Sequence, residues 1–180
     1  MRQIALLIFS IVFFSACSTE ENKWALQTFN EGGFVVNMPT NIEKSEKTEV
    51  TAFGKQVKHF VRWKPSSFAI DKFKLFEVSY TNSPVSDQAD SGSVSAALDK
   101  AVELRKKDFS EVDIIQHQPI ELNGYPGRAF FFDDNKGNSM VTVKMCIAGN
   151  KLYDLVVISK KNYSTNAEAA QFFDSFKLTK

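Results

Sequence analysis

Histidine and cysteine are scarce in this sequence, with two of each among 180 residues. His59 and His117 stand alone on segments that we expect to be strands, and no group of His, Cys and acidic residues has metal-ligand spacing. Because a zinc site needs three or four converging ligands, the sequence predicts no metal site. It also lacks a Gly-x-Ser-x-Gly turn, a phosphate-binding loop and a dinucleotide fingerprint. We therefore expect a non-enzymatic protein without a cofactor, and keep a hydrolase assembled from distant residues only as a third hypothesis.

An excess of charge of either sign is also missing. The chain has 22 Lys and Arg residues against 21 Asp and Glu residues, and Arg2 is the one charged side chain before Cys17. From Cys17 onward the two signs therefore balance. Binding to nucleic acid needs clustered Lys or Arg, so we expect no nucleic-acid partner. No internal repeat or long low-complexity segment occurs, and the length is that of a single domain.

The N-terminus carries the most informative pattern. Arg2 is followed by an apolar run over residues 4–14, then by the small residues Ser15 and Ala16, and then by Cys17. This is the order of a secretory signal. The run is about half of the ~20 residues that a membrane-spanning helix needs, so we do not expect a permanent span.

The segment before Cys17 resembles the lipobox of bacterial lipoproteins, although Phe14 stands where that family usually has Leu. The resemblance implies that residues 1–16 are a cleaved signal peptide and that Cys17 is acylated. The alternative is an ordinary cleaved signal in which Cys17 is incidental. Two or more acyl chains anchor a protein stably in a bilayer. In lipoproteins of this kind Asp after the cysteine favours the inner membrane, so Ser18 implies the outer membrane.

Residues 17–23 are expected to form the lipidated N-terminus and a polar tether, and residues 24–180 a single domain. With Cys17 acylated, Cys146 has no partner within the chain, so no internal disulfide is expected. Cys146 lies in an apolar stretch, residues 141–148, where a buried thiol behaves as a small hydrophobic group. We expect it to be inert.

Within the domain, β-branched and aromatic runs predict strands on either side of one helix. Gly54-Lys55 and Gly149-Asn150 read as tight hairpin turns, residues 123–127 as a longer turn, and Thr81–Ser93 as a flexible loop. A helix is expected over residues 94–109, with Arg105 at the edge of its apolar stripe and its head in water. Thr165 to Glu168 has capping-box spacing and starts a last helix. The expected strands are residues 33–38, 48–53, 56–63, 73–80, 112–122, 128–134, 139–148 and 151–159.

The central strands of the expected sheet are apolar on both faces. Residues 130–132 and 152–158 lack the alternation of a sheet that is wetted on one side. We therefore predict an α+β fold with a mainly antiparallel sheet, covered by helices on both faces.

These features resemble the Mog1/PsbP-like family. The residues that carry the resemblance are the strand at 33–39, the hairpin around Gly54, the turn at 122–128, the strand at 150–157 and the closing segment 172–178. The resemblance implies an α-β-α sandwich and a non-catalytic accessory role. No functional residue transfers, because none of these positions is a shared chemical site.

Two aromatic residues beside expected loops, Trp63 and Tyr125, are candidate contacts for a partner, with packing under their loops as the alternative. The leading hypothesis is a membrane-anchored accessory or protein-binding module of the cell envelope, with an envelope protein as partner. The alternative is a carrier in which the sheet and the loop Thr81–Ser93 enclose a small apolar molecule or lipid.

Overall fold

The computed structural model describes residues 23–51, 54–65, 72–109, 114–134, 138–163 and 166–179. The predicted signal peptide, Cys17 and nearly all of the predicted tether lie outside the described residues. Within the described ranges, no helix combines the length and the apolar character needed to cross a membrane.

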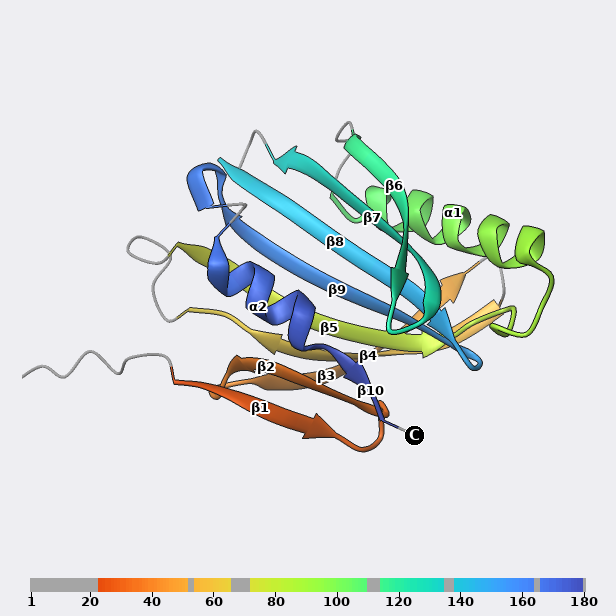
Figure 1. The fold of residues 1–180 in the computed structure, drawn as a ribbon, viewed down its shortest axis with the longest axis horizontal. Helices are drawn as coiled ribbons and strands as arrows, with labels where there is room; N and C mark the ends of the chain where they lie inside the picture. The colour runs from red at the N-terminus through yellow and green to blue at the C-terminus, as the bar shows by residue number, and fades with distance from the viewer. Residues whose placement is uncertain are drawn as a thin grey trace, which may run out of the picture.

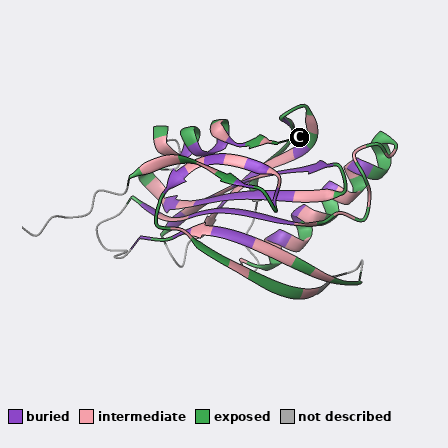
Figure 2. Ribbon diagram, turned by 90° about the horizontal axis from the view of Figure 1, so that it is seen from below, coloured by how far each residue is buried: buried purple, intermediate pink, exposed green. Residues whose placement is uncertain are grey.

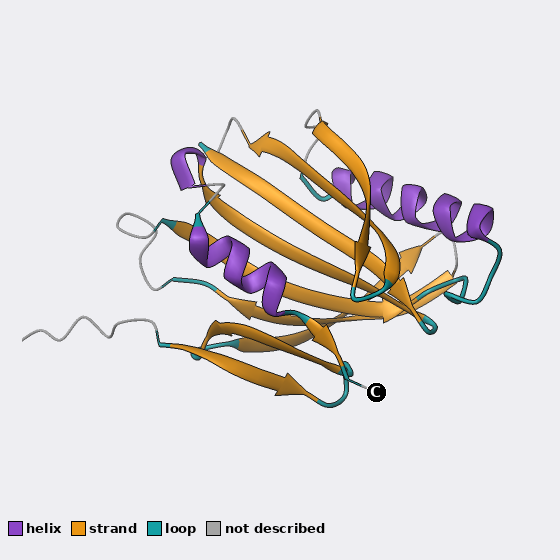
Figure 3. Cartoon of the chain, viewed as in Figure 1, coloured by secondary structure: helices purple, strands orange, loops and turns teal. Residues whose placement is uncertain are grey.

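Seven antiparallel strands form the main sheet (Figures 1 and 3). Their spatial order is β3 (Glu43–Thr51), β4 (Gly54–Trp63), β5 (Phe73–Asn82), β9 (Lys151–Lys160), β8 (Ser139–Ala148), β7 (Tyr125–Asp134) and β6 (Ile114–Leu122). A second antiparallel sheet has the order β1 (Trp24–Phe29), β2 (Phe34–Pro39) and β10 (Lys177–Leu178). The helices are α1 (Ser91–Lys107) and α2 (Ala167–Ser175), with a short 3-10 turn, η1 (Lys161–Tyr163), after β9. The prediction of an α+β fold with a mainly antiparallel sheet is confirmed.

Alternate residues of β8 belong to two different cores, because side chains of a strand point to opposite faces of its sheet. Met145 and Ile147 pack with α1 residues in what we call the α1-side core. Cys146 and Ala148 pack with residues of α2 and β2 in the α2-side core. Because both faces of the sheet are covered by a core, buried residues lie along the inner strands and exposed residues lie toward the sheet edges (Figure 2).

The expected single sheet between helical layers is wrong in one respect, because β1, β2 and β10 form a separate sheet over the α2-side core. β1 was not expected, since Trp24–Phe29 carries only a weak alternation of buried and exposed residues. β10 has two residues and is held by pairing with β2, where Lys177 lies opposite Val35. Only tertiary pairing defines strands of this kind.

The hairpin turns sit close to where the sequence places them, with one shift. The Gly149-Asn150 turn is confirmed, since Ala148 pairs with Lys151 across it. The turn after β6 is shorter than expected: Asn123 and Gly124 alone form it, with φ of 56° and 82°. Such values suit an Asn-Gly hairpin turn. The turn expected at Gly54-Lys55 is wrong, because both residues belong to β4, where Gly54 pairs with Thr51 and Lys55 with Val50.

Both helices begin at a side-chain cap. α1 starts three residues earlier than expected, because Asp90 accepts a hydrogen bond from the Ser93 backbone N–H at 2.9 Å and caps the helix inside the expected loop. α2 is capped by Asn166, whose side chain accepts from the Glu168 backbone N–H at 2.9 Å. Thr165, the expected cap, lies outside the described residues. Caps of this kind satisfy backbone donors that have no partner within the helix.

Candidate functional site: a groove beside helix α1

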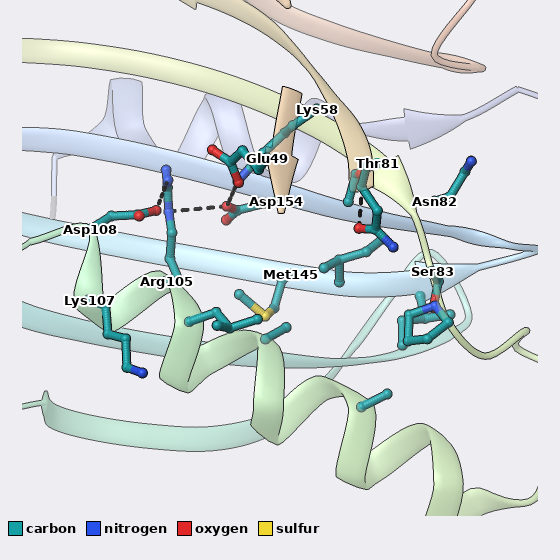
Figure 4. Close-up of a pocket in the computed structure, with 17 residues that line it drawn as sticks. Glu49, Lys58, Thr81, Asn82, Ser83, Arg105, Lys107, Asp108, Met145 and Asp154 are labelled. Atoms are coloured by element: carbon teal, nitrogen blue, oxygen red, sulfur yellow. Dashed lines mark hydrogen bonds and ion pairs between the residues drawn. The ribbon is translucent and has the colours of Figure 1, made fainter. Parts of the chain in front are cut away.

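Helix α1 packs along β7 and β8, and beside it the same face of β4, β5 and β9 lines a groove. We call this the α1 groove. It consists of two hollows that share Glu49, Lys58, Arg105 and Asp108 in their linings. The first hollow is a cavity of about 260 Å³ and the second, nearer the end of α1, is of about 360 Å³. The two hollows therefore share four charged side chains, which Figure 4 shows in the lining of the first hollow.

A buried ion cluster forms the floor of the α1 groove. Glu77 of β5 is 2% exposed and accepts from Arg62 Nε of β4 at one carboxylate oxygen. Its other oxygen, Oε1, accepts from Arg105 NH2 of α1 at 2.8 Å. Arg105 NH1 also donates to Asp108 Oδ2 at 3.0 Å. The carboxylate of Glu77 therefore links β4 and β5 to the last turn of α1.

Asp154 of β9 extends the cluster. Its Oδ2 accepts from Lys58 Nζ at 3.3 Å and lies 3.1 Å from Arg105 Nε, which is an ion-pair distance outside hydrogen-bond geometry. Asp154 Oδ1 is buried and has no hydrogen-bond partner among the described protein atoms. A buried polar atom without a hydrogen bond destabilises the folded state by about 1–3 kcal/mol. Asp154 Oδ1 and Arg105 Nε are therefore the two buried atoms of the cluster that have no hydrogen-bond partner among the described protein atoms.

The charge state of Arg105 is held by its neighbours. Burial acts to lower the pKa of Arg105, but the carboxylates of Asp154, Glu77 and Asp108 outweigh it, and the pKa is raised above its ordinary value. The guanidinium also lies 5.2 Å from the ring centroid of Phe109. The expectation that the Arg105 head is in water is wrong, because three carboxylates converge on it beneath the helix.

The cavity of about 260 Å³ has an apolar wall opposite its charged floor. Met145 and Leu152 come from the sheet, while Ala97, Ala101 and Leu104 come from α1. The mouth is framed by Thr81, Asn82, Ser83 and Pro84, at the start of the segment that the sequence marked as a loop. The cavity is thus amphipathic, with an apolar side and a hydrogen-bonding end.

His59 lies away from this groove, on the α2 side of β4. Its ring stacks on Tyr80 at a centroid distance of 4.7 Å, and Nδ1 is 2.9 Å from Glu46 Oε1. Burial, followed by the charges of Glu31 and Glu46, raises the pKa of Tyr80. The partners of His59 are therefore a ring and an exposed carboxylate, which suit a packing role on β4.

His117 lies on β6 and pairs with α1 at the surface. Its Nε2 is 4.0 Å from Asp99 Oδ1, which already accepts from Arg128 Nε at 2.7 Å. Ser95 Oγ accepts from Arg128 NH2 at 2.6 Å. These contacts form a surface ion-pair network that joins α1 to β7. Among the residues that the structure describes, no group of three or more His, Cys, Asp and Glu side chains is placed to hold a metal ion.

The two aromatic residues predicted as partner contacts, Trp63 and Tyr125, differ in how far they are buried. Trp63 is 4% exposed and its ring lies 5.7 Å from that of Phe76, so the prediction that it is an exposed contact is wrong. Tyr125 is the first residue of β7 rather than part of a turn, and it packs half-buried against the α2-side core. Its role toward a partner stays a prediction.

The Cys146 thiol is fully buried, as expected. Burial raises its pKa to about 12, so the thiolate is a negligible species near neutral pH. Its neighbour Tyr153 donates a hydrogen bond to the Gly32 backbone carbonyl at 2.8 Å. Cys146 is therefore a packing residue of the α2-side core.

Sequence reasoning missed Glu77 and Asp154 as members of a site. Each is an acidic residue inside an otherwise apolar strand, and both are nearly fully buried. Acidic residues are almost never buried unless they are paired. That rule is the signal by which the sequence could have marked them, since Arg105 interrupts the apolar stripe of α1 in the same way.

No protein-family model matches this chain, and no curated protein matches it. The solution structure of cyanobacterial PsbP (CyanoP) from Synechocystis sp. PCC 6803 is similar in fold. It has 8% sequence identity and a TM-score of 0.57, over 92% of this chain and 98% of that one. A crystal structure of PA94 from Pseudomonas aeruginosa, a protein of unknown function described as a putative regulator, has 9% identity and a TM-score of 0.40, over 82% and 90%. The likeness to CyanoP shows that this chain has a PsbP-like fold.

Proposed function

We propose that this chain is a lipid-anchored, non-enzymatic protein of the bacterial cell envelope, held at the outer membrane by acyl chains on Cys17. There it acts as an accessory or protein-binding module. The order of charged, apolar and small residues before Cys17 supports the anchor. The first strand begins at Trp24, so six residues separate it from Cys17. A linker of that length spans at most ~20 Å, which keeps the domain close to the bilayer.

The α1 groove is the observation that carries the binding role. The residues of its ion cluster lie on β4, β5, β9 and α1, so regular secondary structure, not a loop, fixes the positions of these charges. Fixed charges of both signs in a concave surface favour selection of a complementary partner. We therefore place the partner-binding surface at the α1 groove.

Photo-crosslinking in intact cells tests this surface. A benzoylphenylalanine replaces Lys107, which lines the groove, or Lys100, which is exposed on the same helix and lines neither hollow. We expect a discrete crosslinked product from position 107 and not from position 100. Equal products at both positions, or none at 107, would contradict the assignment of the groove.

Metabolic labelling with palmitate tests the anchor separately. The wild-type chain should incorporate label and sediment with outer membranes. The Cys17→Ser variant should do neither, because acylation needs the thiol at that position. Unlabelled wild-type chain recovered in a soluble fraction would argue against the anchor while leaving the groove untouched.

One observation favours a second function, that of a carrier for a small molecule. The cavity of about 260 Å³ opens between α1 and residues at the start of the segment Thr81–Ser93. Its size is close to the lower end of small-molecule sites, which begin at about 300 Å³. Native mass spectrometry of gently extracted chain should then show a bound ligand, and uniformly ligand-free protein would count against a carrier.

A further inference from the structure

The cavity at the apolar end of the α1 groove constrains the ligand that a carrier of this fold would take. This constraint rests on the second proposed function, the carrier, and defines the class of its ligand. Three observations converge: the volume of the cavity, one buried acceptor without a donor, and the charge balance of its floor.

The volume limits the ligand to a small molecule. About 260 Å³ corresponds to the space of roughly nine water molecules, each occupying ≈ 30 Å³ in the liquid. The apolar wall, with Met145 and Leu104, favours a hydrocarbon body. A full phospholipid exceeds this space, whereas a chain of about six carbons with one polar group fits it.

The polar group must donate a hydrogen bond. Asp154 lines the cavity, its side chain is 5% exposed, and its Oδ1 has no hydrogen-bond partner among the described protein atoms. Its other oxygen is already shared by Lys58 and Arg105. A ligand hydroxyl at Oδ1 would supply the missing donor. Because a hydroxyl also accepts, it suits Arg105 Nε as well, the buried donor of the lining that has no hydrogen-bond partner among the described protein atoms.

The polar group must also be uncharged. Three cations, Lys58, Arg62 and Arg105, meet three carboxylates, Glu77, Asp108 and Asp154, within the cluster. An anionic head would compete with those carboxylates for Arg105, and a cationic head would face Lys58 and Arg105. Either would leave an uncompensated charge away from bulk water. The lining has one further charge of each sign. Lys107 is exposed to solvent, and Glu49 pairs with Lys47 at 3.1 Å.

We propose that this cavity binds a small, uncharged amphiphile, with its hydroxyl group at Asp154 Oδ1 and its apolar body between α1 and β8. The site is built entirely from described residues of the folded domain. It is separate from the lipid expected on Cys17, which is attached covalently and lies outside the described residues.

Four probes of similar length separate the requirements for a donor and for neutrality. Hexan-1-ol is neutral with a donor, 1-methoxypentane is its isomer without one, and hexanoate and hexylammonium carry opposite charges. The full acylated chain is reconstituted in phospholipid nanodiscs and labelled with [13C]methyl-methionine. Met145 lines the cavity, whereas Met38 is buried in the α2-side core and serves as the internal reference.

Hexan-1-ol should shift the Met145 signal saturably and leave Met38 in place. Its dissociation constant should be about tenfold lower than that of each other probe, since a lost donor or an added buried charge is worth about a factor of ten or more. Asp154→Asn places a donor at the same point, so this variant should bind the alcohol and the ether equally.

Two alanines of α1 give a matched pair of variants. Ala101 lines the cavity, and Ala101→Leu should weaken hexan-1-ol binding by about tenfold because the added carbons occupy its space. Ala96 is exposed, and Ala96→Leu should leave binding unchanged. The Met38 signal reports in each case that the domain is folded.

The outcomes separate this inference from the carrier function. Tightest binding by a charged probe or by the ether would overturn the neutral hydroxyl while the carrier function stood. Absence of any saturable Met145 shift would also overturn it, and native mass spectrometry would then decide the carrier function independently. Equal weakening by Ala101→Leu and Ala96→Leu would show that the probes bind elsewhere.

Discussion

The two faces of the seven-stranded sheet are closed in different ways. The α2-side core is aromatic, with Phe34, Phe76 and Phe172 each 0–1% exposed and the rings of Phe76 and Phe172 5.3 Å apart. A second sheet and a helix close it. The α1-side core is largely aliphatic and is covered by a single helix, so that a buried ion cluster and two hollows lie beside it. The α2-side face is thus closed by packed rings, whereas the α1-side face keeps open space beside its one helix.

Truncating the aromatic core should have the largest effect on stability. Phe172→Ala removes a fully buried ring and should lower the free energy of unfolding by about 4 kcal/mol, through lost transfer energy and a residual cavity. Phe109→Ala, at a half-buried position on the α1 side, should cost about half as much. Urea denaturation measures both, and equal losses would contradict the difference in ring burial between the two positions.

Breaking the ion cluster should have the second largest effect on stability. Glu77→Ala leaves Arg62 and Arg105 without their shared carboxylate and should cost about 3 kcal/mol, because buried charge becomes uncompensated. Glu121→Ala removes an exposed carboxylate of β6 and should change stability by less than about 0.5 kcal/mol. If both variants unfold at the same urea concentration, the cluster does not contribute to the fold in the way described.

Removing the cap of α2 should have a smaller effect. Asn166→Ala deletes the side chain that accepts from the Glu168 backbone N–H and should cost about 1 kcal/mol. Gln171→Ala, at an exposed position of the same helix, should stay within about 0.5 kcal/mol of wild type. A larger loss at Gln171 than at Asn166 would mean that the cap is not the element that starts α2.

The smallest expected effect is the pH dependence contributed by Asp99 on the α1 side. The hydrogen bond from Arg128 is the main cause that holds the pKa of Asp99 below its ordinary value of 3.8. Its stabilising effect is therefore complete above about pH 4 and is lost as the pH falls through the lowered pKa.

Asp99→Asn should thus be less stable than wild type at neutral pH, and the difference should shrink as the pH falls below the ordinary pKa of 3.8. Thermal unfolding across that range measures it. In an Arg128→Gln background the same substitution should show a weaker pH dependence, and an unchanged dependence would show that Arg128 is not the cause.

Much of the local structure was predictable because it depends on neighbouring residues. The Gly149-Asn150 turn, the apolar stripe of α1 and the buried Cys146 all follow from short patterns, although α1 begins three residues before the predicted start at Val94. The length of β3 did not, since Glu43–Thr51 is a charged edge strand without apolar alternation. Charged side chains on an edge strand oppose pairing with another chain. They also remove the apolar alternation by which a strand is predicted from sequence.

The candidate site was less predictable, for a different reason. Glu77, Arg105 and Asp154 are separated by many residues, and each alone looks like an isolated charge in an apolar segment. Their meeting depends on the order β4-β5-β9 and on the position where α1 ends. No short-range pattern encodes that order.

By itself the amino-acid sequence determined the α+β class, the mainly antiparallel pairing and the short hairpin between β8 and β9, because turn chemistry and side-chain periodicity act over a few residues. Tertiary structure alone decided that a second sheet covers the α2-side core, that Trp63 is buried, and that Asp154 meets Arg105 beside an open cavity. Those outcomes depend on which distant strands pair, and that choice is made by the packing of the whole chain.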